Sequence, residues 1–322
     1  MPIMKYIQRY CTANSTFFGK QKLKQIKIEK QITIPVGINI PYPLATMTTT
    51  PKETINLTFG ESAKYHERIQ ALGTIEESGM TPANLATAKS QYESLGFQCQ
   101  IYDLTQIPML ADTNPISTST PNTPSQKLDP AQLLVIKRAI TNSAALYEEQ
   151  LQFPRDKKAL MYGRVLNYKA HHKLCFSDFD QAPDYPSGKR TVINFSKTPH
   201  LAAIRDSLPK ITKLPQLEGL QCNATYYYDT SKTYFPWHGI SNRQRWYGIS
   251  DRRIVVGIQL GATFPLHFRW IQMGLPISQV LTLSLEDGDM YIMSEKATGN
   301  DWAYSSLPTL RHAAGDLQWI DK

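Results

Sequence analysis

The sequence has 322 residues, of which 41% are hydrophobic and 19% charged, enough to bury one large core or two smaller ones. It contains no run of about 18 apolar residues, so no membrane-spanning helix and no membrane partner are expected. The four cysteines, Cys11, Cys99, Cys175 and Cys222, show no paired spacing, which excludes a disulfide framework or Cys-x-x-Cys zinc site and favours an intracellular, reducing compartment.

The net charge of +8 is concentrated near the N-terminus. Residues 1–60 contain eight Lys or Arg and two acidic residues, a balance of +6, so the remaining 262 residues carry only +2. This distribution weakens an interpretation of the folded body as a nucleic-acid surface. The basic stretch is expected to be a solvated arm of a cytoplasmic or nuclear protein. Organelle targeting is the alternative, although transit peptides favour Arg over Lys.

The first third of the chain predicts a tail followed by a small folded unit. Residues 1–55 show no amphipathic pattern and are expected to be irregular. The pattern is weakly helical over 61–72. It is strongly helical from Thr81 to Gly96, where Thr, Pro and Gly occupy the expected capping positions, and a strand is expected over 98–104. Residues 56–111 are therefore predicted to form a small α/β appendage.

A linker and a helix are predicted next. Residues 112–130 are rich in Ser, Thr, Pro and Asn, a composition typical of a linker. Asp129 and Pro130 are expected to cap a helix that ends near residues 147–149 and packs against a sheet. A second short helix is expected from Leu201 to Leu208, ending at Pro209.

Residues 161–194 are polar, aromatic and rich in turns. Adjacent side chains in a strand point to opposite faces, so His171 and His172 are not expected to bind one ion together. Basic and aromatic residues are interleaved here. A solvated surface is the preferred interpretation, and a loop that contacts an anion or a base is the functional alternative; the residues are Arg164, Lys169, His171, His172, Lys173, Tyr162, Tyr168 and Phe176.

After Leu220 the sequence predicts short strands separated by turns. They cover 222–229, 254–261, 265–271, 279–285, 290–293 and 309–314. Such strands without long intervening helices favour a β-sandwich or barrel over a βαβ sheet. The predicted fold class is α+β, with a double-stranded β-helix (jelly roll) core over 131–322 that is backed by helices, in addition to the N-terminal appendage.

Two histidines are the main candidates for a metal site. His238 lies at the expected end of one strand and before a turn, where the backbone can fix the ring and leave one side open. His312 lies in the last predicted strand. His267, between them in an apolar strand, is expected to be a packed or hydrogen-bonded core residue.

These residues resemble the 2-oxoglutarate- and iron(II)-dependent oxygenase superfamily, and most closely its AlkB-like branch, with a C-terminal stretch similar to that of prolyl 4-hydroxylases. The family pattern is a His-x-Asp pair, a distant His and a Lys or Arg about ten residues further on. The resemblance implies iron bound by His238 and His312. It implies that 2-oxoglutarate is held by Lys322, ten residues after His312, with Tyr228 as a further contact. Arg311, or Arg252 and Arg253 of the following strand, are the substitutes for that lysine.

The sequence departs from this pattern at the carboxylate. Ile240 stands two residues after His238, where the family has Asp. Residues 237–243 (WHGISNR) are nearly repeated as 246–252 (WYGISDR), and Asp251 of the second copy is the candidate third ligand. The resemblance implies hydroxylation or demethylation of a nucleobase or a protein side chain with oxygen. The alternative is a catalytically inactive jelly-roll binding module that has lost the metal carboxylate.

Overall fold

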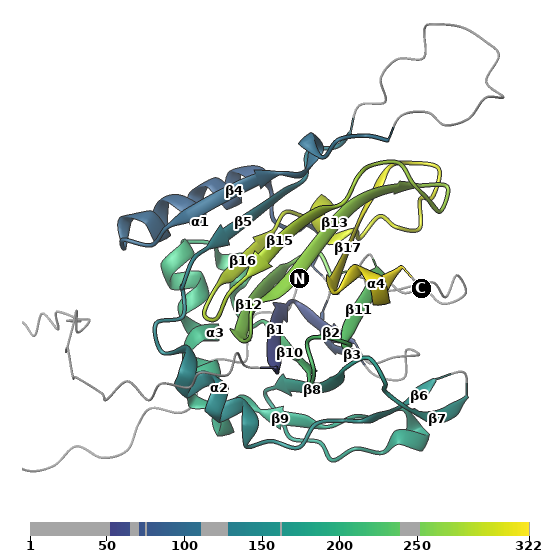
Figure 1. Cartoon of the computed structure of the whole chain (residues 1–322). Coiled ribbons are helices and arrows are strands. Elements are labelled where there is room, and N and C mark those ends of the chain that lie inside the picture. Colours follow the sequence, from purple (N-terminus) through teal and green to yellow (C-terminus); the bar gives the residue numbers. More distant parts are fainter. Residues whose placement is uncertain are drawn as a thin grey trace, which may run out of the picture. The chain divides into compact units, whose positions relative to one another are not determined.

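The computed structural model describes residues 52–64, 71–74, 76–110, 128–161, 163–238 and 252–321. Within these residues the protein is rich in β-sheet and has few helices, as Figure 1 shows, so the predicted α+β class is confirmed at this level. The predicted N-terminal tail and the predicted linker lie almost wholly outside the described residues.

The larger sheet has eight strands in the order β4-β5-β16-β12-β1-β10-β8-β9. Its neighbours are antiparallel except for the parallel pair β8–β9. The strands are β1 (Thr54–Gly60), β4 (Cys99–Asp103), β5 (Gln132–Ile136), β8 (His172–Ser177), β9 (Val192–Asn194), β10 (Gln221–Tyr227), β12 (Val255–Gly261) and β16 (Met290–Met293).

The smaller sheet runs β11-β17-β13-β14, and β15 also pairs with β13. Its strands are β11 (Tyr234–His238), β13 (Phe264–Gln272), β14 (Leu275–Pro276), β15 (Leu281–Leu285) and β17 (Thr309–Gly315). Two separate hairpins are β2 (Ser62–Lys64) with β3 (Ala71–Gly73), and β6 (Lys158–Met161) with β7 (Arg164–Asn167). All six strands that the sequence predicts after Leu220 are confirmed.

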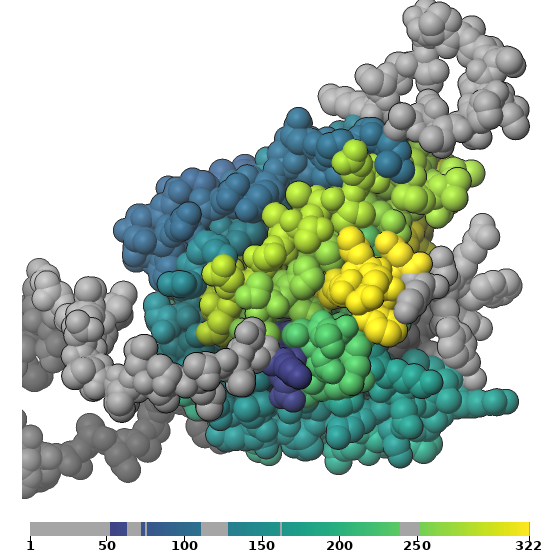
Figure 2. All heavy atoms as spheres, viewed as in Figure 1, coloured from purple at the N-terminus to yellow at the C-terminus, as the bar shows by residue number. Residues whose placement is uncertain are grey.

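Four α-helices accompany the sheets in the described residues: α1 (Pro82–Ser94), α2 (Ser143–Leu151), α3 (Pro199–Thr212) and α4 (Leu317–Ile320). The predicted α1 begins with a capping box, in which Thr81 and Asn84 each accept a hydrogen bond from the other's backbone N–H. In Figure 2 the C-terminal residues around α4, in yellow, lie on the surface beside the green β-strands. No helix in the described ranges is long and apolar enough to cross a membrane.

Helix α3 continues through Pro209, so the predicted end at that residue is wrong. The helix loses the N–H of Pro209, but its last turn is held by burial of Leu208 and Thr212. The hydroxyl of Thr212 also donates a hydrogen bond of 2.6 Å to the carbonyl of Leu208. Packing therefore compensates for the missing backbone bond.

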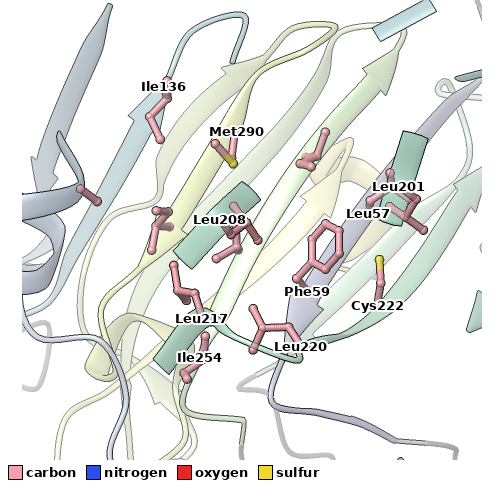
Figure 3. Packing of buried hydrophobic residues seen from close by; sticks show 14 of the residues in the cluster. Leu57, Phe59, Ile136, Leu201, Leu208, Leu217, Leu220, Cys222, Ile254 and Met290 are labelled. Carbon is pink, nitrogen blue, oxygen red and sulfur yellow. The ribbon is translucent and has the colours of Figure 1, made fainter. Parts of the chain in front are cut away.

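Two layers of core lie on the two faces of the larger sheet. One cluster packs this sheet against α1 and α3, and Figure 3 shows Leu57 and Phe59 facing Leu201 and Leu208 in this layer. The other cluster packs the two sheets face to face, with Val255 and Tyr291 on one side and Phe268 on the other. The second layer makes the protein a β-sandwich.

The segment that the sequence predicts as a helix after Pro130 instead forms strand β5, followed by α2. Leu134 and Ile136 point into the helix-side cluster, whereas Leu133 and Val135 point between the sheets. A strand that is buried on both faces reads as a continuous apolar run, which periodicity cannot distinguish from a buried helix.

Residues 56–111, expected to form an appendage, contribute strands to the main sheet. Strand β1 lies in the interior of that sheet and pairs along its length with β10 on one side and with β12 on the other. Strand β4 pairs with β5 at one edge. The N-terminal part of the described chain is thus built into the sandwich, because its strand completes the hydrogen bonding of two later strands.

Changing Gly257 to alanine is expected to destabilise the sandwich by about 1–3 kcal/mol, a typical cost of overpacking. A Cβ atom at Gly257 would overlap the ring of Tyr291, which lies across the interior face of β12 and β16. Urea denaturation measures the cost. Most of the cost should vanish in a Tyr291→Ala background, and an equal cost in both backgrounds would contradict this explanation.

Candidate metal and anion site between the two sheets

The two candidate histidines lie side by side on neighbouring strands of the smaller sheet. His238 ends β11 and is the direct cross-strand partner of His312 on β17, after a register irregularity between Phe235 and His238. The centroids of the two imidazole rings are 4.2 Å apart. Directly opposite residues of an antiparallel pair have neighbouring side chains. The structure therefore brings together two residues that are 74 positions apart in the sequence.

Both imidazoles are in the neutral form at pH 7. Burial lowers the pKa of His312 to about 4. Burial, and then the nearby His312 and Lys173, hold the pKa of His238 well below its usual value. The neutral ring, with a free lone pair, is the form of histidine that binds metal ions.

The hydrogen bonds leave nitrogen atoms of both rings available. Nδ1 of His238 donates to the carbonyl of Pro236 at 2.8 Å, and in a neutral ring this places the lone pair on Nε2. Such a bond to a backbone carbonyl is typical of metal-binding histidines. Nδ1 of His312 is buried and has no hydrogen-bond partner in the described part of the chain. A buried polar atom of this kind costs about 1–3 kcal/mol, so the pair is suited to a ligand.

The pair faces a cavity of about 190 Å³ between the sheets. One wall is the smaller sheet with the two histidines, Phe264 and Leu266. The opposite wall is formed by the larger sheet and is mostly polar. It includes the apolar Val255 and Met293 and the polar or amphipathic side chains Asn56, Thr58, Lys173, Asn223, Thr225, Tyr227, Gln259 and Tyr291. The interior of a β-sandwich is normally apolar. In this wall Asn56 accepts hydrogen bonds from Thr58 and Tyr291 and donates one to Gln259. A polar wall at this position indicates a binding site.

Strand β1 shows how the sequence produces this wall. Its residues alternate, so that Ile55, Leu57 and Phe59 join the helix-side core, while Asn56 and Thr58 line the cavity. In a sheet with one solvated face, the polar half of such an alternation would meet water. Here it faces the cavity between the two sheets.

Two cations complete the polar wall. Lys173 comes from β8 and its Nζ lies 4.6 Å from the ring centroid of Phe235, which in turn contacts the ring of His238 at a tilt of 42°. Burial, and then the charges of Arg190 and Arg252, lower the pKa of Lys173 to about 7. Arg252 precedes β12 and is only 7% exposed. Neither cation forms an ion pair with a carboxylate among the described residues, which makes this end of the cavity a site for an anion.

The position of Arg252 is fixed by its neighbours. The buried carboxylate of Glu61 accepts hydrogen bonds from the backbone N–H groups of Arg253, at 2.5 Å, and Ile254, at 3.0 Å. Gly60 lies against the side chain of Arg252, where a Cβ would be 2.9 Å from its Cδ. Arg253 pairs with Glu295 and does not line the cavity.

Several residues that the resemblance proposes for the site are found elsewhere. Tyr228 donates a hydrogen bond to the carbonyl of Lys169 and stacks on His172, outside the cavity, whereas its neighbour Tyr227 lines the cavity. Arg311 alternates with His312 along β17 and lies opposite Arg269, away from the cavity. In both cases the reason is that adjacent residues of a strand point to opposite faces. Asp251, Ile240 and Lys322 lie outside the described residues.

Three further histidines of the described residues have structural contacts. His267 hydrogen-bonds to Thr282 through Nδ1 and to the carbonyl of Gly315 through Nε2, as expected for a hydrogen-bonded core residue. His171 is bonded to the carbonyl of Tyr234, and His172 lies on the other face of β8, so the two point apart as predicted.

The donor set for a metal is incomplete in the described part of the chain. No group of three or more His, Cys, Asp or Glu side chains that could hold a metal ion is found there. Of the three predicted ligands, the structure places His238 and His312 together. A third ligand would therefore have to come from outside the described ranges.

No family model matches the chain. The chain is 36% identical over 267 residues to "Uncharacterized protein R156" of Acanthamoeba polyphaga mimivirus, an alignment that covers 82% of this chain and 96% of the viral protein. At this identity and coverage, the chain belongs to the same family as the mimivirus protein. That relative is uncharacterised, so the inference of function rests on the site.

Proposed function

We propose that the protein is a 2-oxoglutarate- and iron(II)-dependent oxygenase that acts on a nucleobase or a protein side chain. The observation that carries this proposal is the pair of neutral histidines on adjacent strands, which faces a cavity with two cations, Lys173 and Arg252, at its polar wall. The histidines suit a metal ion, and the cations suit the far carboxylate of a dicarboxylate cosubstrate.

The order of the strands supports a jelly roll as the core. From β10 to β17 the chain passes between the sheets: β10, β12 and β16 are in the larger one, and β11, β13, β15 and β17 in the smaller one. This is the path of the first seven strands of a double-stranded β-helix. The eighth strand would lie between β10 and β12, and β1 occupies that place.

Because β1 takes the place of the eighth strand, the cation that binds the cosubstrate has to come from another position in the chain. In the family pattern, a Lys or Arg about ten residues after the distal histidine lies on the eighth strand. Here β1 presents the neutral side chains Asn56 and Thr58 to the cavity instead. The proposed cations are Lys173 on β8 and Arg252 at the start of β12, in place of Lys322 and Arg311.

The residues of the chain fit the two implied groups. Iron would be held by the imidazoles of His238 and His312, with the carboxylate of Asp251, which directly precedes Arg252 in the sequence, as the proposed third ligand. When bound, iron and 2-oxoglutarate supply the oxidising chemistry, and the protein orients them and limits the access of water. A cavity of about 150 Å³ can hold benzene, so 190 Å³ admits a molecule near the size of a five-carbon dicarboxylate.

Anaerobic titration of the intact chain with Fe(II), followed by addition of 2-oxoglutarate and oxygen, tests the proposal. The expected results are one bound iron per chain and release of succinate that requires both iron and oxygen. The absence of a third metal ligand among the described residues favours an alternative, a jelly-roll module that binds a dicarboxylate without metal. Binding of 2-oxoglutarate without any binding of iron would establish that alternative and overturn the enzyme.

A further inference from the structure

A second hollow, of about 590 Å³, lies on the opposite face of β8 and β10 from the metal and anion cavity. Neighbouring residues of β8 divide between the two sites, because His172 lines the hollow and Lys173 lines the cavity. The hollow is lined by Phe153, Pro154, Arg155, Lys157, His172, Tyr226 and Tyr228.

Stacked rings with a cation at each end form one side of the hollow. The guanidinium of Arg155 lies 4.1 Å from the ring centroid of Tyr226, and Tyr226 stacks on His172 at 6.1 Å. His172 stacks on Tyr228 at 4.9 Å, and the ammonium of Lys232 lies 5.9 Å from the Tyr228 ring. Each ring restrains its neighbours, so the side chains are preorganised.

The side chains of the hollow that can still hydrogen-bond to a ligand are cationic or neutral donors. The hydroxyl of Tyr226 is bonded to Glu53, and that of Tyr228 to the carbonyl of Lys169, so neither phenol is free. Arg155 uses one N–H group on the carbonyl of Gln150, which leaves others to donate. Lys157 is exposed at the rim. None of the lining residues carries a carboxylate.

The rest of the lining is apolar and flat. Phe153 is half-buried and packs edge-on against Phe176 of the core, and Pro154 is exposed beside it. His172 has a buried Nδ1 with no hydrogen-bond partner among the described residues. Burial lowers the pKa of His172, so a neutral, polar ring edge adjoins the apolar wall.

We propose that this hollow binds a nucleotide unit, with the phosphate against Arg155 and Lys157 and the base against Phe153 and Pro154. The guanidinium of an arginine can donate two parallel N–H hydrogen bonds to a phosphate, and the ammonium of a lysine adds a compact positive charge. A single phosphate would fill little of a 590 Å³ hollow, whereas small-molecule sites of about 300–1,000 Å³ are usual for ligands of nucleotide size. The unit can be a free nucleotide or part of a single strand, and the site is independent of the proposed oxygenase.

Calorimetric titration of the full chain with AMP, adenosine, inorganic phosphate and a short oligothymidylate tests the proposal. AMP or the oligonucleotide should bind more tightly than phosphate or adenosine. Arg155→Gln and Lys157→Gln should each weaken that binding by about tenfold, the typical effect of losing a charge-assisted hydrogen bond. Lys158→Gln, at the exposed neighbouring position in β6, is the matched control and should have no effect.

The probes distinguish the two sources of the unit. Tight AMP binding indicates a free nucleotide. Binding of the oligonucleotide alone, with a salt dependence that becomes shallower in Lys157→Gln, indicates a strand. The proposal is overturned if no probe binds at millimolar concentration, or if phosphate binds as tightly as AMP and the oligonucleotide. It is also overturned if Lys157→Gln leaves binding unchanged, because Lys157 is exposed and its substitution should not affect folding.

Discussion

Changing His238 or His312 to alanine is expected to lower the affinity for Fe(II) by about 100-fold or more and to abolish succinate release. Even residues that only support metal ligands typically contribute about 10–100-fold, so loss of a ligand should cost at least as much. The two ring centroids are 4.2 Å apart and both rings are neutral, so each can offer a lone pair to the same ion. His267 already uses both ring nitrogens in hydrogen bonds.

Anaerobic Fe(II) titration of the two variants measures this effect. His200→Ala, at an exposed position on α3, is the matched control and should bind iron as the parent does. His312 is buried, so His312→Gln is made alongside the alanine variant to keep the volume and the fold, and thermal unfolding checks both. Unchanged iron affinity in a folded His238→Ala or His312→Ala variant would remove the pair from the proposed metal site.

The strands of the C-terminal half could be predicted because their local pattern and their tertiary setting agree. Residues 254–261, 265–271 and 290–293 are short, β-branched or aromatic runs between turn residues, and each forms the expected strand. Strand β5 could not be predicted, since Leu133 to Ile136 are buried on both faces and show no alternation. The place of β1 could not be predicted either, because nothing local indicates which strands it joins.

Besides the two histidines, the sequence pointed to Lys173, within a segment predicted to contact an anion, and to Arg252, as a possible substitute cation for the cosubstrate. The spacing to a cation suggested Lys322 and Arg311, but strand alternation alone places Arg311 on the face opposite His312. The same rule separates Tyr227, which lines the cavity, from Tyr228, which does not. Lys173 is brought to the cavity by the pairing of β8 with β10, a long-range contact that no spacing in the sequence reveals.

In the proposed jelly roll, β1 holds the place between β10 and β12 that an eighth strand after β17 would take. A cation placed about ten residues after the distal histidine is useful only if the chain then returns to the sheet between β10 and β12. In this protein that place is taken, and after β17 the chain forms α4 instead. The far carboxylate of the proposed cosubstrate needs a cation at the cavity whichever strand supplies it. Lys173 and Arg252 can provide that cation.

Changing Lys173 to methionine or Arg252 to glutamine is expected to weaken 2-oxoglutarate binding by about 100-fold each. Each variant would leave a buried carboxylate without its charged partner, a loss of about 2–5 kcal/mol in comparable sites. Calorimetric titration with 2-oxoglutarate measures the loss. Lys189→Met and Arg253→Gln, at residues outside the cavity, are the matched controls. Equal affinity in Lys173→Met and in the parent would exclude Lys173 as the anchor.

The same lysine should give the parent a distinctive dependence on pH. Without ligand its pKa is about 7, below the ordinary 10.5, so the folded chain binds fewer protons than the unfolded chain between these values. The free energy of unfolding should therefore rise with pH across this window. Binding of a dicarboxylate needs the charged amine, so it should weaken as pH rises above 7.

The variant Lys173→Met removes this charge. It should melt several degrees higher than the parent at pH 6, with the difference shrinking towards pH 10, and its residual binding should be nearly independent of pH. A parent whose affinity stays constant from pH 6 to 9 would show that the charge of Lys173 does not hold the cosubstrate.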